Sequence, residues 1–241
     1  MEALILSAGL SSRLGRLTKD FHKSLLEINP GLKIIDNQLI SLRKAGIRKI
    51  VIVVGYKSEK LINYAKSHYP DLNFRFVDNK IFASTNCLYS LWLSRQYLKD
   101  DLIYMTGDLV MDTNLISEMV KNGQDSIFSV NIENENNRDF CARAKEGIVS
   151  EVSINLRGND VFPCLPLMRL SSASFNLWLD AADEMINKGL VNEYEMAALN
   201  KVLGQIKVSA YFSDRFCMEV DEKEDLFFLR DFQESYKLGE Q

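Results

Sequence analysis

Residues 3–28 read ALILSAGLSSRLGRLTKDFHKSLLEI, and this stretch decides the fold. The apolar run 3–6 predicts a buried strand, and a basic loop rich in Gly and Ser follows it. A loop after a parallel strand lies at the carboxyl end of the sheet, where open α/β folds bind ligands and backbone N–H groups form anion nests. Arg13 and Lys23 add positive charge there. The alternative is an ordinary βα turn with solvated basic residues.

The composition is that of a soluble globular protein. The chain has 241 residues, which fits one large α/β domain with a full hydrophobic core. No apolar run approaches the roughly 20 residues of a membrane helix, and the N-terminal run lacks the basic leader of a signal peptide. The net charge of -4 provides no basic face for nucleic acid. We therefore expect neither membrane insertion nor a nucleic-acid partner.

Cysteine and histidine are too scattered for a zinc site or a disulfide framework. The four cysteines form no C-x-x-C pair, and the only histidines are His22 and His68. Reduced cysteines packed as small apolar groups suit a cytoplasmic protein. Any metal is expected to be hard and bound by oxygen.

Strand and helix signals alternate through the first half of the chain. The run KIVIVV at 49–54 is continuously apolar, which is typical of a parallel strand covered on both faces. The predicted strands are 3–6, 49–54, 73–77 and 102–106, and the predicted helices are 34–45, 57–68, 87–97 and 115–122. This order predicts an α/β fold with a Rossmann-like, doubly wound, mostly parallel sheet and helices on both faces.

The pattern becomes rich in strands after residue 122. The predicted strands are 126–130, 138–144, 148–154, 165–170 and 207–211, and the predicted helices are 171–188, 193–203 and 222–237. Residues 131–138 (NIENENNR) predict a solvated loop. We expect this part to form a small β-rich insert after the α/β half.

Two aspartates are candidate metal ligands. Asp108 follows a predicted strand and a glycine, so its carboxylate is expected at the same sheet edge as the first loop, where it could hold Mg²⁺ against phosphate oxygens. The alternative is an aspartate that caps a turn. Asp221 and Glu224 have capping-box spacing. Glu219 and Asp221, two apart on an extended segment, could instead complete an oxygen-ligand site with Asp108.

Tyr194 and Glu195 begin a predicted helix, where an acid suits the helix dipole. An aromatic ring beside a carboxylate is also what a small cation needs, and Phe140 and Phe162 could add ring surface. Both interpretations stay open, because aromatic residues are common in protein cores.

Five short motifs occur in order along nearly the whole chain. They are Gly9-Leu10-Ser11-Ser12-Arg13, a basic stretch that ends in Lys23, Gly55-Tyr56, Gly107-Asp108 and EVDEKEDL at 219–226. Together they resemble the nucleotidyltransferase family that makes nucleoside-diphosphate sugars and CDP-linked alcohols. HKSLL at 22–26, TNCLYSL at 85–91 and Tyr194-Glu195 are most similar to small bacterial cytidylyltransferases that act on choline phosphate or 2-aminoethylphosphonate.

The resemblance implies a role for each matching residue. The nucleotide-binding positions would be Ala8, Gly9, Leu10, Ser11 and Ser12 around the triphosphate, Gly55 and Tyr56 at the base, Asn86 near the nucleotide or acceptor, and Asp108. Arg13 would hold the leaving pyrophosphate, and Lys23 would reach the α-phosphate. Asp108 and Asp221 would bind Mg²⁺, which favours the metal role of Asp221 over a cap.

The same resemblance implies one nucleotidyltransferase domain over residues 1–241. Residues 1–130 would be the nucleotide-binding half, 131–220 the acceptor-side half and 221–241 a closing helix. Phe140, Tyr194 and Glu195 are the expected acceptor-binding residues. The expected reaction transfers CMP from CTP to the phosphate or phosphonate of a small, amine-bearing acceptor by Mg²⁺-dependent in-line displacement, and releases pyrophosphate.

The chain departs from the family pattern in two places. Ser11 stands where relatives usually have a second glycine, and Asn155 stands near the position of a lysine common in sugar-phosphate enzymes, which weakens a sugar phosphate as the acceptor. A hexose-1-phosphate nucleotidyltransferase and a non-catalytic nucleotide-binding regulatory module are the alternatives. Retention of Arg13, Lys23, Asp108 and Asp221 argues against the regulatory module. The sequence leaves the acceptor and the oligomeric state, a homodimer included, undetermined.

Overall fold

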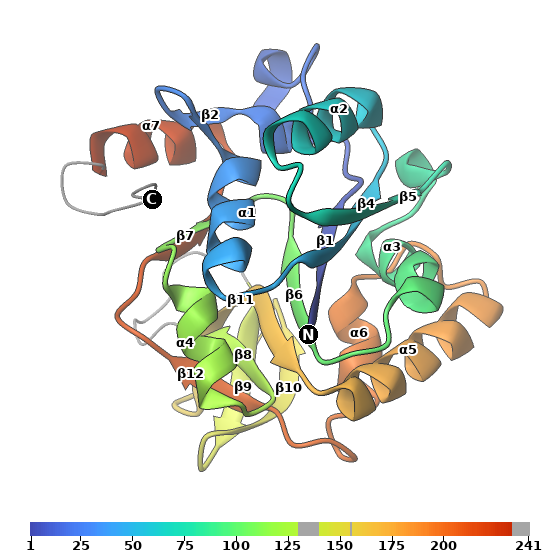
Figure 1. Cartoon of the computed structure of the whole chain (residues 1–241). Helices are drawn as coiled ribbons and strands as arrows, with labels where there is room; N and C mark the ends of the chain where they lie inside the picture. The colour runs from blue at the N-terminus through green and yellow to red at the C-terminus, as the bar shows by residue number, and fades with distance from the viewer. Residues whose placement is uncertain (130–139, 155, 233–241) are drawn as a thin grey trace.

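A long twisted sheet runs through the centre of the molecule (Figure 1). The structure is a computed structural model and describes residues 1–129, 140–154 and 156–232. Within these residues, nine strands form one sheet in the spatial order β5 (Asn73–Asp78), β4 (Lys49–Val54), β1 (Glu2–Ser7), β6 (Leu102–Thr106), β11 (Val161–Leu170), β8 (Ser126–Ser129), β12 (Ser209–Phe212), β10 (Ile148–Ser153) and β9 (Cys141–Lys145).

The first four strands form the predicted parallel part of the sheet. β1 lies between β4 and β6, with Leu6 opposite both Val53 and Thr106. From β1 the chain first adds β4 and β5 on one side and then adds β6 on the other. Such a reversal of strand order creates a crevice at the carboxyl ends of the strands, where doubly wound folds bind ligands. The loop after β1 and the loop after β6 meet at this crevice.

The second half of the sheet is mixed, so the prediction of a mostly parallel sheet is wrong. β11 runs antiparallel to both β6 and β8, and β12 runs parallel to β8. β9 pairs with both β10 and β11, which curls these strands into a small closed barrel. The expected insert is therefore a continuation of the main sheet. β11 is buried along most of its length like the parallel strands, so a continuous apolar run identifies a strand covered on both faces but does not settle its direction.

Helices cover both faces of the sheet, as predicted. One face is covered by α1 (Ile34–Lys44), α2 (Ser58–His68) and α4 (Leu115–Asn122), and the other by α3 (Cys87–Ser94), α5 (Ser172–Asn187) and α6 (Glu195–Asn200) (Figure 1). Alternate residues of β1 pack against the two helix layers, because successive side chains of a strand point to opposite faces of the sheet. Ile5 packs in the first layer with Leu39, and Leu4 packs in the second with Trp178.

A third layer of small elements brings the end of the chain to the crevice. It consists of β2 (Glu27–Asn29), β3 (Leu32–Lys33), β7 (Leu109–Met111), β13 (Cys217–Glu219), α7 (Lys223–Phe232) and the 3-10 turns at Ser12–Leu17 and Lys23–Leu25. β13 pairs with β7, which directly follows Asp108, and α7 packs Leu226 and Leu229 against Leu14 and Val110. This pairing carries Asp221 to Asp108.

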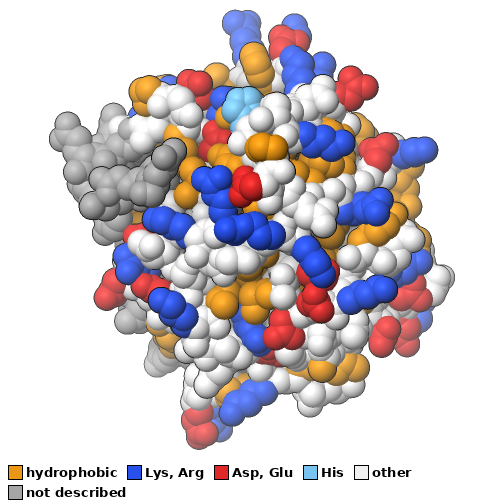
Figure 2. Space-filling model, viewed as in Figure 1, with side chains coloured by type: hydrophobic (Ala, Val, Ile, Leu, Met, Phe, Trp, Pro, Cys, Tyr) orange, Lys and Arg blue, Asp and Glu red, His pale blue; other side chains and the backbone are white. Residues whose placement is uncertain are grey.

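Some predicted segments lie outside the described residues. They are the loop at 131–138, Val130 and Arg138 at strand ends, Asn155, and the last residues of the closing helix. In the part that is described, no helix is long and apolar enough to cross a membrane. Basic and acidic side chains are interspersed on the face drawn in Figure 2.

Candidate active site

The loop after β1 adopts a tight conformation that exposes Gly9 and Leu10. Ser11 has a φ of 55° and a ψ of 36°, which is the left-handed region that glycine adopts without strain. Its carbonyl accepts hydrogen bonds from Leu14 N at 3.2 Å and from the Thr18 hydroxyl at 3.0 Å. Serine at this position thus takes the backbone conformation that a glycine would.

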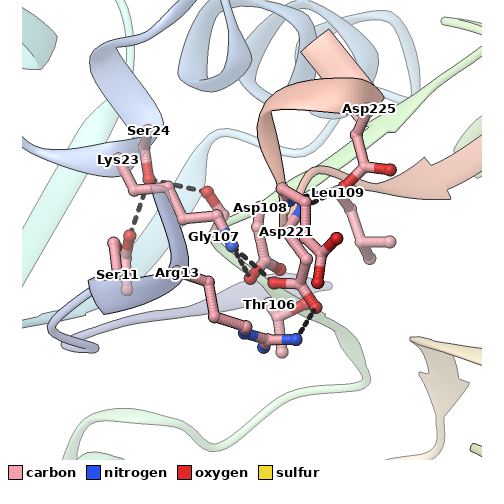
Figure 3. A network of polar contacts seen from close by, with 12 residues as sticks. Ser11, Arg13, Lys23, Ser24, Thr106, Gly107, Asp108, Leu109, Asp221 and Asp225 are labelled. Atoms are coloured by element: carbon pink, nitrogen blue, oxygen red, sulfur yellow. Dashed lines mark hydrogen bonds and ion pairs between the residues drawn. The ribbon is translucent and has the colours of Figure 1, made fainter. Parts of the chain in front are cut away.

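Lys23 joins the two predicted metal ligands (Figure 3). Its Nζ atom lies 2.8 Å from Asp108 Oδ2 and 2.8 Å from Asp221 Oδ1. Arg13 Nη1 lies 2.9 Å from the other oxygen of Asp221. The backbone supports this arrangement, because Val220 N donates to the Asp108 carbonyl at 3.0 Å. Four residues from three separate parts of the sequence therefore meet in one cluster of alternating charge.

Asp221 points into this cluster because another aspartate caps the last helix. Asp225 Oδ2 accepts hydrogen bonds from Asp221 N at 2.6 Å and from Glu222 N at 2.7 Å. The capping-box alternative paired Asp221 with Glu224, and the structure instead gives the capping role to Asp225. The Asp221 carboxylate is left to meet Lys23 and Arg13.

Lys23 and Asp108 both keep their charges in this cluster. Burial alone would lower the pKa of Lys23, but the charges of Asp108 and Asp221 outweigh burial and raise it. Burial alone would raise the pKa of Asp108, and the charge and hydrogen bond of Lys23 outweigh burial and lower it. Lys23 is therefore an ammonium and Asp108 a carboxylate around neutral pH.

These carboxylates fit the predicted Mg²⁺. They are hard oxygen donors that already face one shared cation, Lys23 Nζ. Asp108 Oδ1 is buried and has no hydrogen-bond partner, so it has a lone pair to offer. In the described residues no cluster of three or more His, Cys, Asp or Glu could hold a metal. Mg²⁺ commonly binds through one or two carboxylates and substrate phosphates.

Two adjoining cavities share Leu6, Gly9 and Asp108. The first is lined by Leu6, Ser7, Gly9, Leu10, Ser11, Arg13, His22, Lys23, Ser24, Gly107, Asp108 and Asp221. The second is lined by Leu6, Ala8, Gly9, Asn79, Phe82, Thr85, Asn86, Cys87, Ser90, Thr106 and Asp108. Asp108 therefore lies where the two cavities meet, between the charged cluster and a more apolar compartment.

The predicted base-pocket residues lie beside the second cavity. A Cβ atom at Gly55 would come within 2.6 Å of the Ala8 carbonyl oxygen and 2.9 Å of Phe82, so only glycine fits there. The Tyr56 ring lies 6.3 Å from the Phe82 ring, and its hydroxyl donates to the Lys19 carbonyl. Asn86 lines the second cavity and caps α3 through Cys87 N, at 2.8 Å.

The predicted acceptor residues divide between surface and core. The Phe140 and Tyr194 rings meet edge to face, 5.4 Å apart, and Tyr194 is exposed. Glu195 is only 1% exposed, and its Oε1 accepts a hydrogen bond from the Tyr104 hydroxyl at 2.7 Å. Burial raises the pKa of Glu195. Glu195 thus has a structural role here, and its contact with an acceptor stays a prediction.

Several residues at the site were not predicted. Ser7, His22 and Ser24 line the first cavity and are buried, and Asn79 in the second cavity is buried too. Short polar residues are ordinarily assigned to loops and caps, so composition gives no signal for them. The one available signal is the HKS order around Lys23, since neighbours of a site lysine often support it.

A model of the MobA-like NTP transferase domain matches residues 3–161, so the chain belongs to this family of nucleotidyltransferases. The predicted family is thus confirmed. A CTP:phosphoglutamine cytidylyltransferase of Campylobacter jejuni is 32% identical over 126 residues, which cover 50% of this chain and 48% of that relative. A choline-phosphate cytidylyltransferase of Streptococcus pneumoniae is 29% identical over 163 residues, which cover 67% of this chain and 67% of that relative. A choline-phosphate cytidylyltransferase of Haemophilus influenzae is 36% identical over 115 residues, which cover 48% of this chain and 47% of that relative.

The chain thus spans about half to two thirds of the length of these relatives. The solved CTP:phosphocholine cytidylyltransferase from Streptococcus pneumoniae has a TM-score of 0.81 at 22% identity and covers 96% of this chain and 98% of its own. The inositol-1-phosphate CTP transferase from T. maritima has a TM-score of 0.76 at 15% identity, with 98% and 97% covered. These likenesses show that the mixed α/β fold is shared.

Proposed function

We propose that this protein is a cytidylyltransferase that transfers CMP from CTP to the phosphate or phosphonate of a small, amine-bearing acceptor. The observation that carries the proposal is the position of Lys23 between Asp108 and Asp221, with Arg13 on the outer oxygen of Asp221. This arrangement suits a triphosphate and a hard cation, since it combines two basic side chains with two carboxylates.

The reaction is an in-line displacement at the α-phosphorus of CTP. An oxygen of the acceptor phosphate attacks, a new P–O bond forms, the bond to the β-phosphate oxygen breaks, and pyrophosphate leaves with the electron pair. The acceptor is already largely ionised near neutral pH, because the second pKa of a phosphate ester is about 6, so no strong general base is required. The buried, neutral His22 is therefore not needed as one.

Each basic residue offsets the repulsion between two anions. Lys23 is expected to contact the α-phosphate and to stabilise the charge that develops there, and Arg13 is expected to hold the departing pyrophosphate. The side chain of Arg13 is 57% exposed, which fits contact with the departing pyrophosphate at the open side of the site. The side chain of Lys23 is 12% exposed, which fits contact with the α-phosphate deeper in the site. The loop 8–12 would cradle the remaining phosphate oxygens with its backbone.

Asp108 and Asp221 would hold Mg²⁺. When bound, Mg²⁺ neutralises phosphate charge and orients the triphosphate. Because Lys23 pairs with the same carboxylates in this structure, nucleotide binding is expected to draw Lys23 toward phosphate, which would leave the two carboxylates free to hold the metal. The backbone at both aspartates is held by hydrogen bonds that do not involve Lys23.

The acceptor class is inferred from the relatives and from two aromatic rings. The matched relatives are named for choline phosphate, phosphoglutamine and an aminopropylphosphonate product. Tyr194 presents an exposed ring that is steadied by Phe140, and a ring face attracts an organic cation. We infer CTP as the nucleotide because the same relatives are cytidylyltransferases.

The test is pyrophosphate release with Mg²⁺, measured for ATP, CTP, GTP and UTP against choline phosphate, 2-aminoethylphosphonate, a phosphorylated amide and a hexose 1-phosphate. We expect release with CTP and an amine-bearing acceptor. Release only with the hexose 1-phosphate would support a sugar nucleotidyltransferase instead. No release with any pair would favour a nucleotide-binding regulatory module.

A further inference from the structure

A buried chain of hydrogen bonds lies next to Lys23 and contains no group assigned above to the reaction. Ser24 Oγ donates to the Gly107 carbonyl at 2.6 Å, and the hydroxyls of Ser7 and Ser24 lie 2.7 Å apart. His22 Nε2 lies 2.9 Å from the Ser7 carbonyl, and its Nδ1 lies 3.2 Å from Ser24 N. Ser7, His22 and Ser24 are all buried.

The direction of every bond in this chain follows from the donors present. Ser24 N–H can only donate, so His22 Nδ1 accepts and the imidazole proton lies on Nε2, which donates to the Ser7 carbonyl. The Ser24 hydroxyl proton goes to Gly107, so the Ser7 hydroxyl must donate to Ser24 Oγ. Each of these donors and acceptors therefore has a hydrogen-bond partner, with a single placement of the protons.

The chain of bonds ties three separate segments together. Ser7 ends β1, Ser24 follows Lys23, and Gly107 precedes Asp108. The packing is tight, because a Cβ atom at Gly107 would lie 2.1 Å from the Ser7 hydroxyl oxygen and 3.1 Å from that of Ser24. Lys23 precedes Ser24 in the sequence, and Asp108 follows Gly107. The Ser24–Gly107 hydrogen bond therefore links the backbone next to Lys23 with the backbone next to Asp108.

We propose that Ser24, held by Ser7 and His22, is a positioning residue that sets the placement of Lys23 relative to Asp108. This inference rests on the proposed function, in which Lys23 contacts the reacting phosphate. A displacement of about 1 Å at such a group can cost on the order of 100-fold in rate. Lys23 is expected at the reacting α-phosphate and the loop 8–12 at the other phosphates, so we expect the effect to fall on kcat more than on the KM for CTP.

The test compares Ser24→Ala with Ser94→Ala. Ser94 is also fully buried and also donates to a backbone carbonyl, that of Leu91 at 2.7 Å, but it ends α3 away from the cluster. Both variants lose one buried hydroxyl, and Ser24→Ala is expected to lose more stability because the Ser24 hydroxyl makes two hydrogen bonds and the Ser94 hydroxyl makes one. Ser7→Ala, which keeps the Ser24–Gly107 bond, is expected to have an intermediate effect and serves as the second variant if Ser24→Ala does not fold.

Two measurements are made on each variant. The first is kcat and the KM for CTP, from pyrophosphate release. The second is the rate at which Lys23 reacts with an amine-acylating reagent without nucleotide, read by peptide mass spectrometry, which needs no enzymatic activity. For Ser24→Ala we expect kcat to fall about 20-fold or more with the KM for CTP within about threefold, and Lys23 to be acylated about fivefold faster. For Ser94→Ala we expect neither change.

The proposal is overturned if folded Ser24→Ala, or Ser7→Ala in its place, matches Ser94→Ala in both kcat and Lys23 acylation. If the wild-type protein transfers no nucleotide to any acceptor, the proposed function fails separately. Lys23 acylation then decides the positioning role alone: faster acylation only in the Ser24 and Ser7 variants supports it, and equal rates overturn it.

Discussion

Lys23 and Asp108 are 85 positions apart in the sequence, and Lys23 Nζ lies 2.8 Å from Asp108 Oδ2. The same nitrogen lies 2.8 Å from Asp221 Oδ1, 198 positions away. One ammonium thus balances two carboxylates at the junction of the two cavities.

Asp108→Asn should lower kcat/KM for nucleotide transfer by about 1,000-fold, because the amide removes a ligand charge for Mg²⁺ and a partner of Lys23. The measurement is pyrophosphate release at saturating Mg²⁺. Asp100→Asn, an exposed carboxylate near the opposite end of β6, is the matched control and should leave the rate unchanged. Near-normal turnover in Asp108→Asn would remove this residue from the mechanism.

Asp225→Ala should weaken metal binding without touching a metal ligand. Loss of the two backbone hydrogen bonds removes a helix cap, which costs about 1 kcal/mol, and frees the Asp221 backbone. We expect the Kd for Mn²⁺ in the presence of CTP, measured by calorimetry, to rise about fivefold. Glu224→Ala removes an exposed acid from the same helix turn and should change little. Equal effects of the two changes would show that only helix charge matters.

Ser11→Gly should stabilise the protein. Serine at a φ of 55° is strained by about 1 kcal/mol relative to glycine, and the greater freedom of glycine in the unfolded chain offsets part of the gain. We expect the free energy of unfolding from urea titration to rise by about 0.5 kcal/mol. Ser12→Gly, at the first residue of the following 3-10 turn, should instead lower it. A loss of stability in Ser11→Gly would mean that the side chain makes a contact that matters more than strain.

His22 should make the fold sensitive to acid. Burial lowers the pKa of His22 from 6.5 to about 4, so between these values the unfolded chain binds the proton more readily. This contribution to stability is complete above about pH 6.5 and is lost as the pH falls toward about 4, on the order of 3 kcal/mol in all.

The check is urea denaturation of His22→Asn and His68→Gln at about pH 7 and about pH 5. Asparagine retains an acceptor for Ser24 N, so His22→Asn should lose less stability on acidification than the wild type. His68 is exposed on α2, and His68→Gln should follow the wild type. The same acid loss in His22→Asn as in the wild type would contradict the prediction.

Tyr194 should affect the acceptor and not the nucleotide. Tyr194→Leu is expected to raise the KM for choline phosphate about tenfold and to leave the KM for CTP unchanged, because a leucine offers no ring face to a cation. Tyr194→Phe keeps the ring against Phe140 and should retain most of the affinity. A parallel rise in both KM values after Tyr194→Leu would place the acceptor elsewhere.

Most elements of the fold could be predicted from the sequence, because their apolar periodicity is strong. The apolar runs in β1, β4 and β6 are buried and continuous, and the helices α1 and α2 match their predicted spans to within a residue. β11 was predicted from residue 165 but begins at Val161, because Pro163 is a residue type that argues against a strand. Its antiparallel direction, which makes the sheet mixed, has no local signal at all.

Asp108 could be predicted from its charge at the end of a strand, Lys23 from the basic loop, and Asp221 from the family resemblance. The structure brings the three together. The supporting hydroxyls of Ser7 and Ser24 could not, because a serine is polar in any surroundings and only tertiary packing buries it. Tertiary packing likewise places Glu195, an expected acceptor-binding residue, in the core beside Tyr104.

Phosphorus NMR of the wild-type protein with CTP, Mg²⁺ and choline phosphate tests most directly whether this site transfers CMP. The expected spectrum shows loss of CTP, free pyrophosphate and a pair of coupled diphosphate resonances from CMP joined to the acceptor. The same sample with Lys23→Met should retain its CTP. Unchanged CTP with the wild-type protein and every amine-bearing acceptor, or the same product at the same rate from Lys23→Met, would contradict the proposed site and reaction.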